Sequence, residues 1–269
     1  MVEKVTTRTL LQMKRRGQRI VALTAYDYPS AQMADAAGVD VVLVGDSVGN
    51  TVLGYETTLP VQMEEMLHHL KAVRRGLKHA LLVADMPFLS YGASVDDAVY
   101  NAGALIQAGA EAVKVEGASA RVLETIRALI GIGIPVMAHL GLTPQSVHQF
   151  GGYRLQGRTA SEQEALVQAA QAVQDAGAFS VVLEVIPANL AQQITQSLQI
   201  PTIGIGAGVH CDGEIQVWHD ILGLSAHTLR HTKRFADLRE TITHALRQYA
   251  DAVRAKQFPS AEQSFEVEP

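Results

Sequence analysis

The sequence has little of what several protein classes require. It contains a single cysteine, Cys211, which excludes a disulfide within the chain and a zinc site built from several thiolates. Its 22 Lys and Arg against 27 Asp and Glu form no basic stripe, so we expect no nucleic-acid partner. The sequence has no apolar run of about 18 residues, and its opening MVEKVTTRTL lacks the apolar core of a signal peptide. We therefore expect a cytoplasmic protein that does not contact a membrane.

Aromatic residues are also scarce. They make up 5% of a chain that is 48% hydrophobic, so the core must consist mainly of Val, Ile, Leu and Ala. Such cores are typical of parallel strands covered by helices. The length of 269 residues suits one (β/α)8 barrel, which typically needs about 250. We predict one barrel catalytic domain over residues 1–255. A flexible tail is expected over residues 256–269, where Pro, Ser and Glu interrupt helical periodicity.

Short apolar, β-branched runs alternate with Ala-rich stretches that have helical spacing, a pattern that predicts βα units and a parallel sheet. Gly38, Gly109 and Gly177 each precede such a run, where glycine suits the left-handed turn from a helix into a strand. We predict an α/β fold, a closed (β/α)8 TIM barrel rather than an open doubly wound sheet. The expected strands cover residues 19–25, 39–45, 80–86, 111–117, 134–140, 179–185, 200–206 and, more weakly, 219–224.

Three acidic residues stand at the ends of predicted strands: Asp46, Asp85 and Glu116. The C-terminal ends of barrel strands meet at one mouth, where three carboxylates repel one another unless a cation or protons intervene. Oxygen ligands without a nearby thiolate suit Mg²⁺, with Mn²⁺ or Co²⁺ as substitutes. The alternative is that each carboxylate caps the following helix.

Lys114 lies two residues before Glu116, so both side chains point to the same side of a strand. One interpretation is a buried ion pair. In the other, Lys114 offers a cation to a substrate carboxylate or enolate while Glu116 faces the metal.

Two further polar residues end apolar runs. His139 is either a hydrogen-bonded structural residue or a participant in catalysis. Glu184 is either a desolvated general base with a raised pKa or the structural partner of an arginine such as Arg154 or Arg158. The residues alone leave both choices open.

Long motifs in the chain resemble the ketopantoate hydroxymethyltransferase family. The resemblance covers residues 7–254 and begins with TAYDYPSAQMADAAGVDVVLVGDSVGNTVLGYETTLP over residues 24–60. It continues with DMPFLSY from Asp85, KVEG from Lys114, HLGLTPQSVHQFGGYRLQGR from His139, LEVIP from Leu183 and IPTIGIGAG from Ile200.

This resemblance implies a (β/α)8 barrel assembled as a homodecamer. It also implies the transfer of a hydroxymethyl group from 5,10-methylenetetrahydrofolate to 3-methyl-2-oxobutanoate, which gives 2-dehydropantoate on the route to pantothenate. The resemblance also assigns ligand-binding roles to matching positions. It implies that Mg²⁺ is bound, directly or through water, by Asp46, Asp85 and Glu116. It implies that the 2-oxo acid is bound by Asp46, Ser47, Asp85 and Lys114.

Two more residues gain a role from the resemblance. Glu184 matches the proton acceptor of the family, and His139 matches an active-site histidine whose role stays open between product binding and proton relay. The expected chemistry is removal of a proton beside a metal-chelated keto group, followed by attack of the enolate on the one-carbon unit.

Two other functions compete with this one. A phosphoenolpyruvate mutase or isocitrate lyase type enzyme shares the barrel and the metal-enolate chemistry, but the KKCG-like loop of the isocitrate lyase branch is absent from the sequence. A barrel that only binds or assembles predicts the loss of at least one strand-end acid, and all of them are present.

Overall fold

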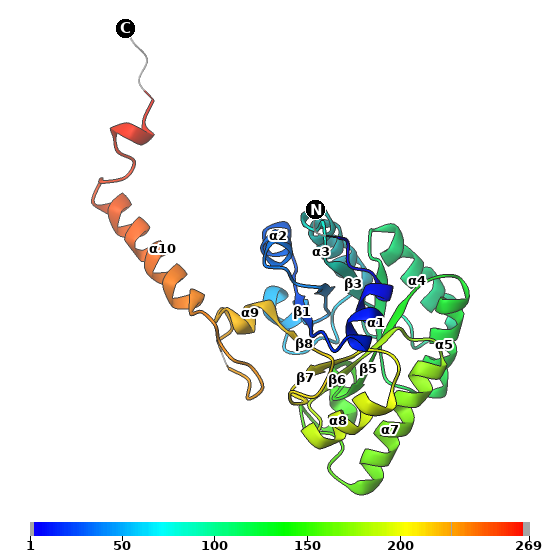
Figure 1. Ribbon diagram of the computed structural model, residues 1–269. Helices are drawn as coiled ribbons and strands as arrows, with labels where there is room; N and C mark the ends of the chain where they lie inside the picture. Colours follow the sequence, from blue (N-terminus) through cyan, green and yellow to red (C-terminus); the bar gives the residue numbers. More distant parts are fainter. Residues whose placement is uncertain (1–2, 227, 266–269) are drawn as a thin grey trace. The chain divides into compact units, whose positions relative to one another are not determined.

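The computed structural model of the protein describes residues 3–226 and 228–265. Its strands form a closed barrel of parallel neighbours in sequence order, in which β8 pairs with β1 (Figure 1). The strands are β1 (Ile20–Thr24), β2 (Val41–Val44), β3 (Leu81–Asp85), β4 (Ala112–Glu116), β5 (Val136–Gly141), β6 (Ser180–Glu184), β7 (Thr202–Ile205) and β8 (Gly213–Gln216). The predicted (β/α)8 barrel is therefore confirmed.

Helices surround the barrel and alternate with most of its strands (Figure 1). They are α1 (Thr7–Arg15), α2 (Tyr28–Ala36), α3 (Met63–Gly76), α4 (Val95–Gln107), α5 (Ala120–Gly131), α6 (Val147–Phe150), α7 (Ala160–Asp175) and α8 (Ala188–Ser197). A π-helical turn, η1 (Gly49–Leu53), follows β2, and a 3-10 turn, η2 (Pro144–Ser146), follows β5.

The interior of the barrel is filled by alternate residues of the strands. Apolar side chains such as Leu81 and Val83 of β3 and Ala112 of β4 belong to one buried cluster. Side chains two residues apart on a strand share a face, so the next inward positions on these two strands are Asp85 and Lys114. The regular pleat therefore places polar groups directly above an apolar core, at the C-terminal mouth.

The predicted glycine turns are confirmed. Gly38, Gly109 and Gly177 follow the C-terminal ends of α2, α4 and α7 with φ of 78°, 111° and 103°. These backbone angles lie in the region that glycine enters without a Cβ clash.

The prediction for the eighth strand was wrong. Residues 219–224 do not form a strand; β8 is Gly213–Gln216, and a short helix, α9 (Trp218–Ile221), covers part of the predicted segment. A Cβ on Gly213 would lie 2.5 Å from the backbone oxygen of Ile20, so the close pairing of β8 with β1 requires glycine here. This strand contains one apolar residue besides that glycine, Ile215, which a search for apolar runs does not detect.

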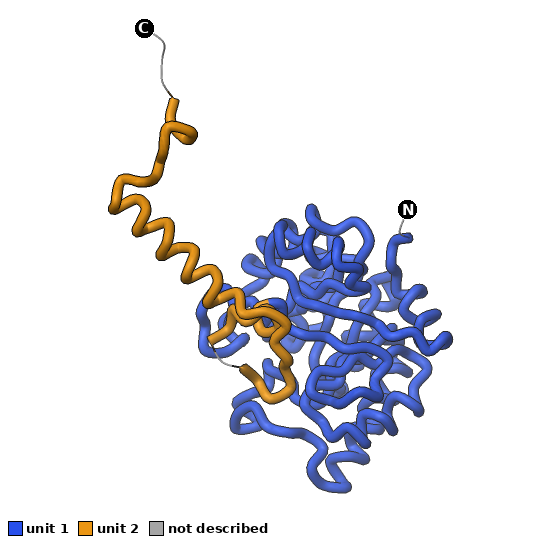
Figure 2. The backbone as a smooth tube through the Cα atoms, turned by 60° about the vertical axis from the view of Figure 1, so that its left-hand side comes forward, with its two compact units in different colours: residues 1–218 blue, residues 219–269 orange. Residues whose placement is uncertain are grey.

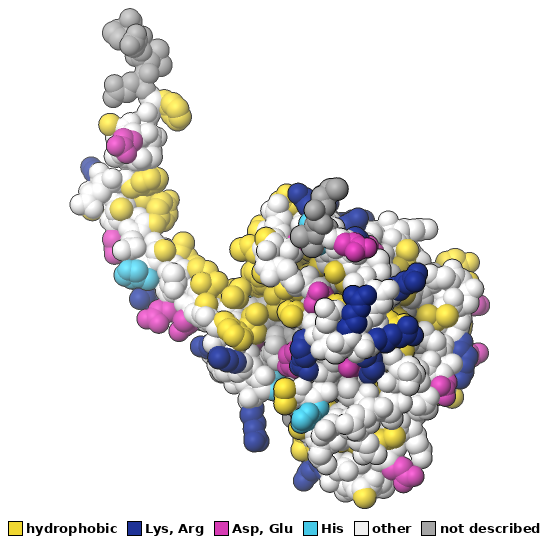
Figure 3. Space-filling view, viewed as in Figure 1, with side chains coloured by type: hydrophobic (Ala, Val, Ile, Leu, Met, Phe, Trp, Pro, Cys, Tyr) yellow, Lys and Arg dark blue, Asp and Glu magenta, His cyan; other side chains and the backbone are white. Residues whose placement is uncertain are grey.

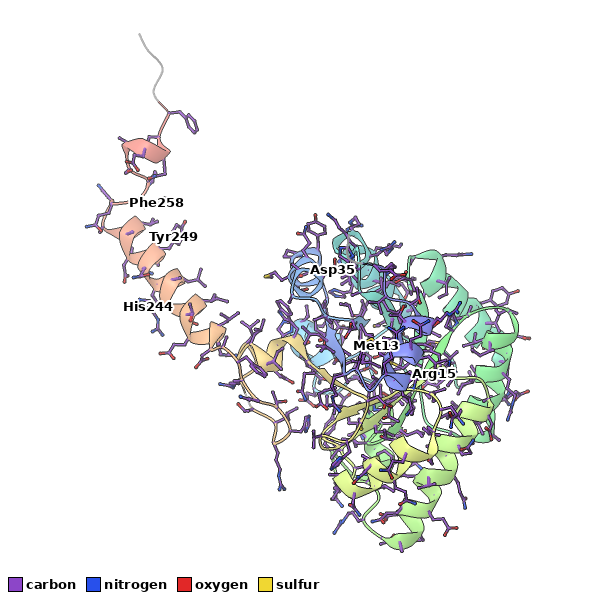
Figure 4. The ribbon with its side chains drawn as sticks, in the orientation of Figure 1. Met13, Arg15, Asp35, His244, Tyr249 and Phe258 are labelled. Atoms are coloured by element: carbon purple, nitrogen blue, oxygen red, sulfur yellow. The ribbon has the colours of Figure 1, made fainter. Side chains whose placement is uncertain are left out.

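The chain forms two compact units, residues 1–218 and residues 219–269 (Figure 2). The second contains α10 (Leu238–Arg254) and a 3-10 turn, η3 (Ala261–Gln263). No residue of α10 is buried, and hydrophobic side chains lie along this helix in Figure 3. The rings of Tyr249 and Phe258, labelled in Figure 4, meet edge to face at 5.7 Å.

The domain boundary at residue 255 and the flexible tail stay predictions. Of the predicted tail, residues 256–265 are described and include η3, whereas residues 266–269 lie outside the described residues. Within the described part of the chain, no helix is both long enough and apolar enough to cross a membrane.

Candidate active site

The predicted polar residues come together at the C-terminal mouth of the barrel, within or directly after β2 to β6. Asp85, Lys114, Glu116 and His139 are at most 6% exposed, and Glu184 is half-buried. Adjacent strands place these residues in register, because Asp85 pairs with Lys114 and Glu116 pairs with His139. The site is thus a direct product of strand pairing.

Each of the three predicted metal-ligand carboxylates has one oxygen held by an N–H donor. Gln145 Nε2 donates to Asp46 Oδ2 at 2.9 Å, and the Asp46 amide donates to Asp85 Oδ2 at 2.9 Å. The Gln145 amide donates to Glu116 Oε2 at 3.0 Å. The helices that follow β3 and β4 are capped by Ser94 and Ser119, and Val48 precedes η1, so none of the three acids caps the next helix.

Lys114 lies between two of these carboxylates. Its Nζ is 2.7 Å from Asp85 Oδ1 and 3.8 Å from Glu116 Oε1. Burial acts to lower the pKa of Lys114, but the charges of Asp85, Glu116 and Asp46 outweigh it and raise that pKa. Lys114 thus forms a buried ion pair, closer to Asp85 than to the Glu116 considered from the sequence, and the ammonium group keeps its charge inside the mouth.

The remaining carboxylates carry more negative charge than Lys114 can balance. Burial raises the pKa of Asp46 to about 8, with further contributions from the charges of Asp85 and Glu116. Burial also raises the pKa of Asp85, and Lys114 offsets only part of that effect. Such a cluster favours either protonation or the binding of another cation.

His139 joins Glu116 to Glu184. Its Nδ1 is 3.3 Å from Glu116 Oε1 and its Nε2 is 3.2 Å from Glu184 Oε2. Burial and the Lys114 charge act to lower the pKa of His139, but the two carboxylates outweigh them and raise it to about 9. Lys114 Nζ, which can only donate, lies 3.3 Å from Nδ1, so in the neutral ring Nδ1 is the acceptor and Nε2 carries the hydrogen.

The partner of Glu184 is thus a histidine. Within the described residues, neither Arg154 nor Arg158 forms an ion pair with Glu184, so the structural alternative considered for this carboxylate is wrong. The Glu184 oxygen that does not face His139 is Oε1.

Ser47 lies beside the carboxylates and is hydrogen-bonded to Tyr26, which follows the neighbouring strand β1. The hydroxyls of Tyr26 and Ser47 are 2.7 Å apart. Tyr26 is buried, which raises its pKa to about 12, so its hydroxyl stays protonated. No sequence pattern singles out Tyr26, because a tyrosine after an apolar run is also an ordinary core residue.

The residues fit a hard divalent cation without forming a complete cage. Asp85 Oδ1 and Glu116 Oε1 are buried acceptors that receive no well-angled hydrogen bond within the described residues, although Lys114 lies near both. Across residues 3–226 and 228–265, no three His, Cys, Asp or Glu side chains converge tightly enough to enclose a metal by themselves. An oxygen donor set of this kind suits Mg²⁺, which retains several water ligands.

Two residues that sequence reasoning missed complete the site. Gln145 is 8% exposed and connects Asp46 with Glu116, and Tyr91 is 6% exposed and donates to Gln145 Oε1 at 2.8 Å. Gln145 lies on η2 and Tyr91 in the segment between β3 and α4. A signal for Gln145 was its place just after β5, but an uncharged residue at a loop position carries no pattern of its own.

The fold defines a (β/α)8 barrel of the enzyme class, and its buried, carboxylate-rich mouth is the candidate active site. The sequence matches the family model described as ketopantoate hydroxymethyltransferase over residues 4–261. It is 53% identical over 270 residues to a 3-methyl-2-oxobutanoate hydroxymethyltransferase of Carboxydothermus hydrogenoformans, with 100% of this chain and 98% of that protein covered. It is 55% identical over 264 residues to the Moorella thermoacetica protein of the same name, with 97% and 98% covered.

The chain therefore belongs to the ketopantoate hydroxymethyltransferase family. Among solved structures, it is similar to phosphonopyruvate hydrolase in complex with oxalate and Mg²⁺, with a TM-score of 0.62, 14% identity and coverage of 96% of this chain and 93% of that one. It is also similar to 2,3-dimethylmalate lyase, a member of the PEP mutase/isocitrate lyase superfamily, with a TM-score of 0.59, 16% identity and coverage of 97% and 91%. At these identities the likeness establishes the fold alone.

Proposed function

We propose that this enzyme transfers a hydroxymethyl group from 5,10-methylenetetrahydrofolate to 3-methyl-2-oxobutanoate and so forms 2-dehydropantoate for pantothenate biosynthesis. Family membership along the whole chain supports this substrate pair. The observation that carries the chemistry is the Glu184–His139 pair beside three carboxylates that each have one oxygen held in place. This arrangement combines a base with a site for a cation.

Asp46, Asp85 and Glu116 would hold Mg²⁺, directly or through water. When bound, the cation polarises the keto group of the substrate and makes the neighbouring carbon more acidic. The held oxygens of the three carboxylates face N–H donors, so their other oxygens keep fixed directions. The buried acceptors Asp85 Oδ1 and Glu116 Oε1 are two of these.

The 2-oxo acid is anionic, and two residues recognise that charge. The Lys114 ammonium group offers a buried cation, and the Ser47 hydroxyl, oriented by Tyr26, offers a hydrogen bond to a substrate oxygen. Both groups lie next to Asp46 and Asp85, so the carboxylate end of the substrate is held beside the cation site.

Glu184 is the proton acceptor. Its Oε1 removes the C3 proton of 3-methyl-2-oxobutanoate, while His139, whose Nε2 lies 3.2 Å from Oε2, pairs with the carboxylate on its other side. The resulting enolate carbon forms a bond to the one-carbon unit, and water supplies the hydroxyl oxygen. Both bonds from that unit to the folate nitrogens N5 and N10 break, and these nitrogens take up the proton removed from C3 and one proton of the water. His139 can then carry a proton between Glu184 and Glu116, which both contact its ring.

A product assay tests the function. Purified protein would be incubated with 3-methyl-2-oxobutanoate, 5,10-methylenetetrahydrofolate and Mg²⁺, and 2-dehydropantoate would be measured by mass spectrometry. We expect product only when all three components are present. Turnover of phosphonopyruvate or 2,3-dimethylmalate, with no 2-dehydropantoate, would instead identify an activity like that of the structural neighbours.

We also infer a homo-oligomer, with a decamer as the expectation from the family resemblance. Supporting this, α10 carries Ile242, Leu246, Tyr249 and Val253 at helical spacing on one face, each at least 43% exposed. An apolar helix face of this kind is typical of an interface with a second copy of the chain. The cytoplasmic location stays a prediction.

Light scattering after size exclusion tests the oligomer. We expect Leu246→Glu to lower the molecular mass, while the same change at His244 on the same helix leaves it unchanged. A wild-type mass equal to the 28.9 kDa of one chain would contradict the inference.

A further inference from the structure

Gln145 is a buried amide in the active site to which the proposed reaction assigns no role. Its Nε2 donates to Asp46 Oδ2 at 2.9 Å and to the Met86 backbone oxygen at 3.0 Å. Its Oε1 accepts from Tyr91 at 2.8 Å, and its backbone N–H donates to Glu116 Oε2 at 3.0 Å. Both amide hydrogens and the amide oxygen are therefore engaged, and one residue connects the C-terminal ends of β2, β3, β4 and β5.

The orientation of this amide is determined by Tyr91. The Glu116 backbone N–H donates to the Tyr91 hydroxyl at 3.1 Å, so the hydroxyl directs its own hydrogen elsewhere. The nearest good acceptor is Gln145 Oε1. With its oxygen facing Tyr91, Gln145 must present its NH2 group to Asp46, because a flipped amide would place its oxygen against the acceptors of Asp46 and Met86 and its NH2 group against the Tyr91 O–H donor.

We propose that Gln145, oriented by Tyr91, is a positioning residue that holds the carboxylates of Asp46 and Glu116 in the orientation that binds the metal. It ties one oxygen of each carboxylate to an N–H donor and leaves the other oxygen directed at the cation site. The proposal rests on the proposed function, since it concerns the cation site of the same reaction.

The geometry explains why an uncharged residue is used. Asp46, Asp85, Glu116 and Glu184 already give the mouth an excess of negative charge, so a fifth carboxylate would add repulsion, whereas an amide supplies donors without charge. Because all polar atoms of the Gln145 amide are paired, it also keeps Asp46 and Glu116 at a fixed separation. Residues that orient metal ligands in this way typically contribute about 10- to 100-fold in metal affinity.

The test is a comparison of Mn²⁺ binding to metal-free protein, measured by calorimetry or by the electron paramagnetic resonance signal of free Mn²⁺. Gln145→Met keeps the length of the side chain and removes its donors. The matched control is Gln174→Met, because the Gln174 amide oxygen also accepts a backbone hydrogen bond, from the Gln199 N–H at 2.6 Å, but Gln174 lies at the opposite end of the barrel. Tyr91→Phe removes only the orienting hydroxyl.

We expect Gln145→Met to weaken Mn²⁺ binding by about 10- to 100-fold, and Gln174→Met to leave it unchanged. Tyr91→Phe should also weaken Mn²⁺ binding. In the double variant, the loss of binding free energy should be smaller than the sum of the losses in the two single variants, because Tyr91 acts through Gln145. Excess Mn²⁺ should restore most of the kcat of Gln145→Met, which a general loss of structure would not allow.

Equal Mn²⁺ affinity in wild type and Gln145→Met would overturn the proposal. Fully additive losses in the double variant would overturn the part played by Tyr91. Wild-type protein that forms no 2-dehydropantoate would contradict the proposed function instead, and the Mn²⁺ comparison would still decide the role of Gln145.

Discussion

Replacing Lys114 by methionine should strongly destabilise the protein, because the change removes the one lysine charge among the buried carboxylates while keeping most of the packing. Lys114 Nζ lies 2.7 Å from Asp85 Oδ1 and 3.8 Å from Glu116 Oε1, with 5% of its side chain exposed. At an effective dielectric constant of about 20, these distances correspond to attractions of about 6 and about 4 kcal/mol. The cost of desolvating the charges offsets a large part of this sum. Breaking such a buried pair typically costs about 3 to 5 kcal/mol.

The measurement is urea unfolding of metal-free protein. The control is Lys4→Met, which breaks a pair of similar length, 2.6 Å to Glu111, whose side chains are 32% and 31% exposed. We expect about 1 kcal/mol or less for the control. Mg²⁺ should reduce the loss of unfolding free energy in Lys114→Met, because the carboxylates left without Lys114 gain another cation. A Lys114→Met protein that loses no more stability than Lys4→Met would refute this account of the charge balance.

Three further predictions concern the fold and the substrate site. Asp35→Asn (Asp35 is labelled in Figure 4) should lower the unfolding free energy by about 1 to 2 kcal/mol, because Asp35 accepts backbone N–H bonds at 2.9 to 3.1 Å from the segment before β3. Gly213→Ala should cost about 1 to 3 kcal/mol by overpacking against β1, measured in urea, whereas Gly103→Ala, with no atom within 4 Å of the new Cβ, should not destabilise. Tyr26→Phe should raise the KM for 3-methyl-2-oxobutanoate about fivefold, the effect of about 1 kcal/mol, since Ser47 loses its partner.

The Asp35 effect should depend on pH in a defined direction. Burial acts to raise the pKa of Asp35, but the three backbone N–H groups outweigh it and lower that pKa. Its contribution to stability is therefore complete above the unfolded pKa of about 3.9 and is lost as pH falls through the folded value. Equal stability of wild type and Asp35→Asn at neutral pH would contradict the prediction for Asp35.

The other two predictions fail separately. Unchanged stability in Gly213→Ala would contradict the overpacking argument, and an unchanged KM in Tyr26→Phe would contradict the role of Tyr26.

The sequence predicted the barrel because each of its first seven strands lies in a short, mostly apolar run, and such runs are visible without knowledge of their partners. The eighth strand was not predicted correctly, because its sequence is not an apolar run. β8 owes its strand conformation to pairing with β1, where Gly213 lies opposite Ile20. The apolar residues after it form α9 instead of a strand.

The charged residues of the site were also predictable, since Asp46, Asp85 and Glu116 each end or directly follow an apolar strand. Their contacts were not. His139 lies opposite Val182 on β6 and contacts Glu184 two residues further along that strand, and the bridge made by Gln145 comes from a turn whose path no periodicity encodes. Residues on strands can be placed from spacing, whereas residues on turns require the fold.

In the proposed reaction, Glu184 removes the C3 proton of 3-methyl-2-oxobutanoate at this site. The most direct test is proton exchange in D2O, followed by the NMR signal of that C3 proton with and without Mg²⁺, in the absence and presence of tetrahydrofolate. We expect exchange that requires Mg²⁺ and wild-type protein and that disappears in Glu184→Gln, a variant that keeps the size of the side chain but cannot accept the proton. Exchange at an unchanged rate in Glu184→Gln, or no exchange by wild type even with tetrahydrofolate, would contradict the account.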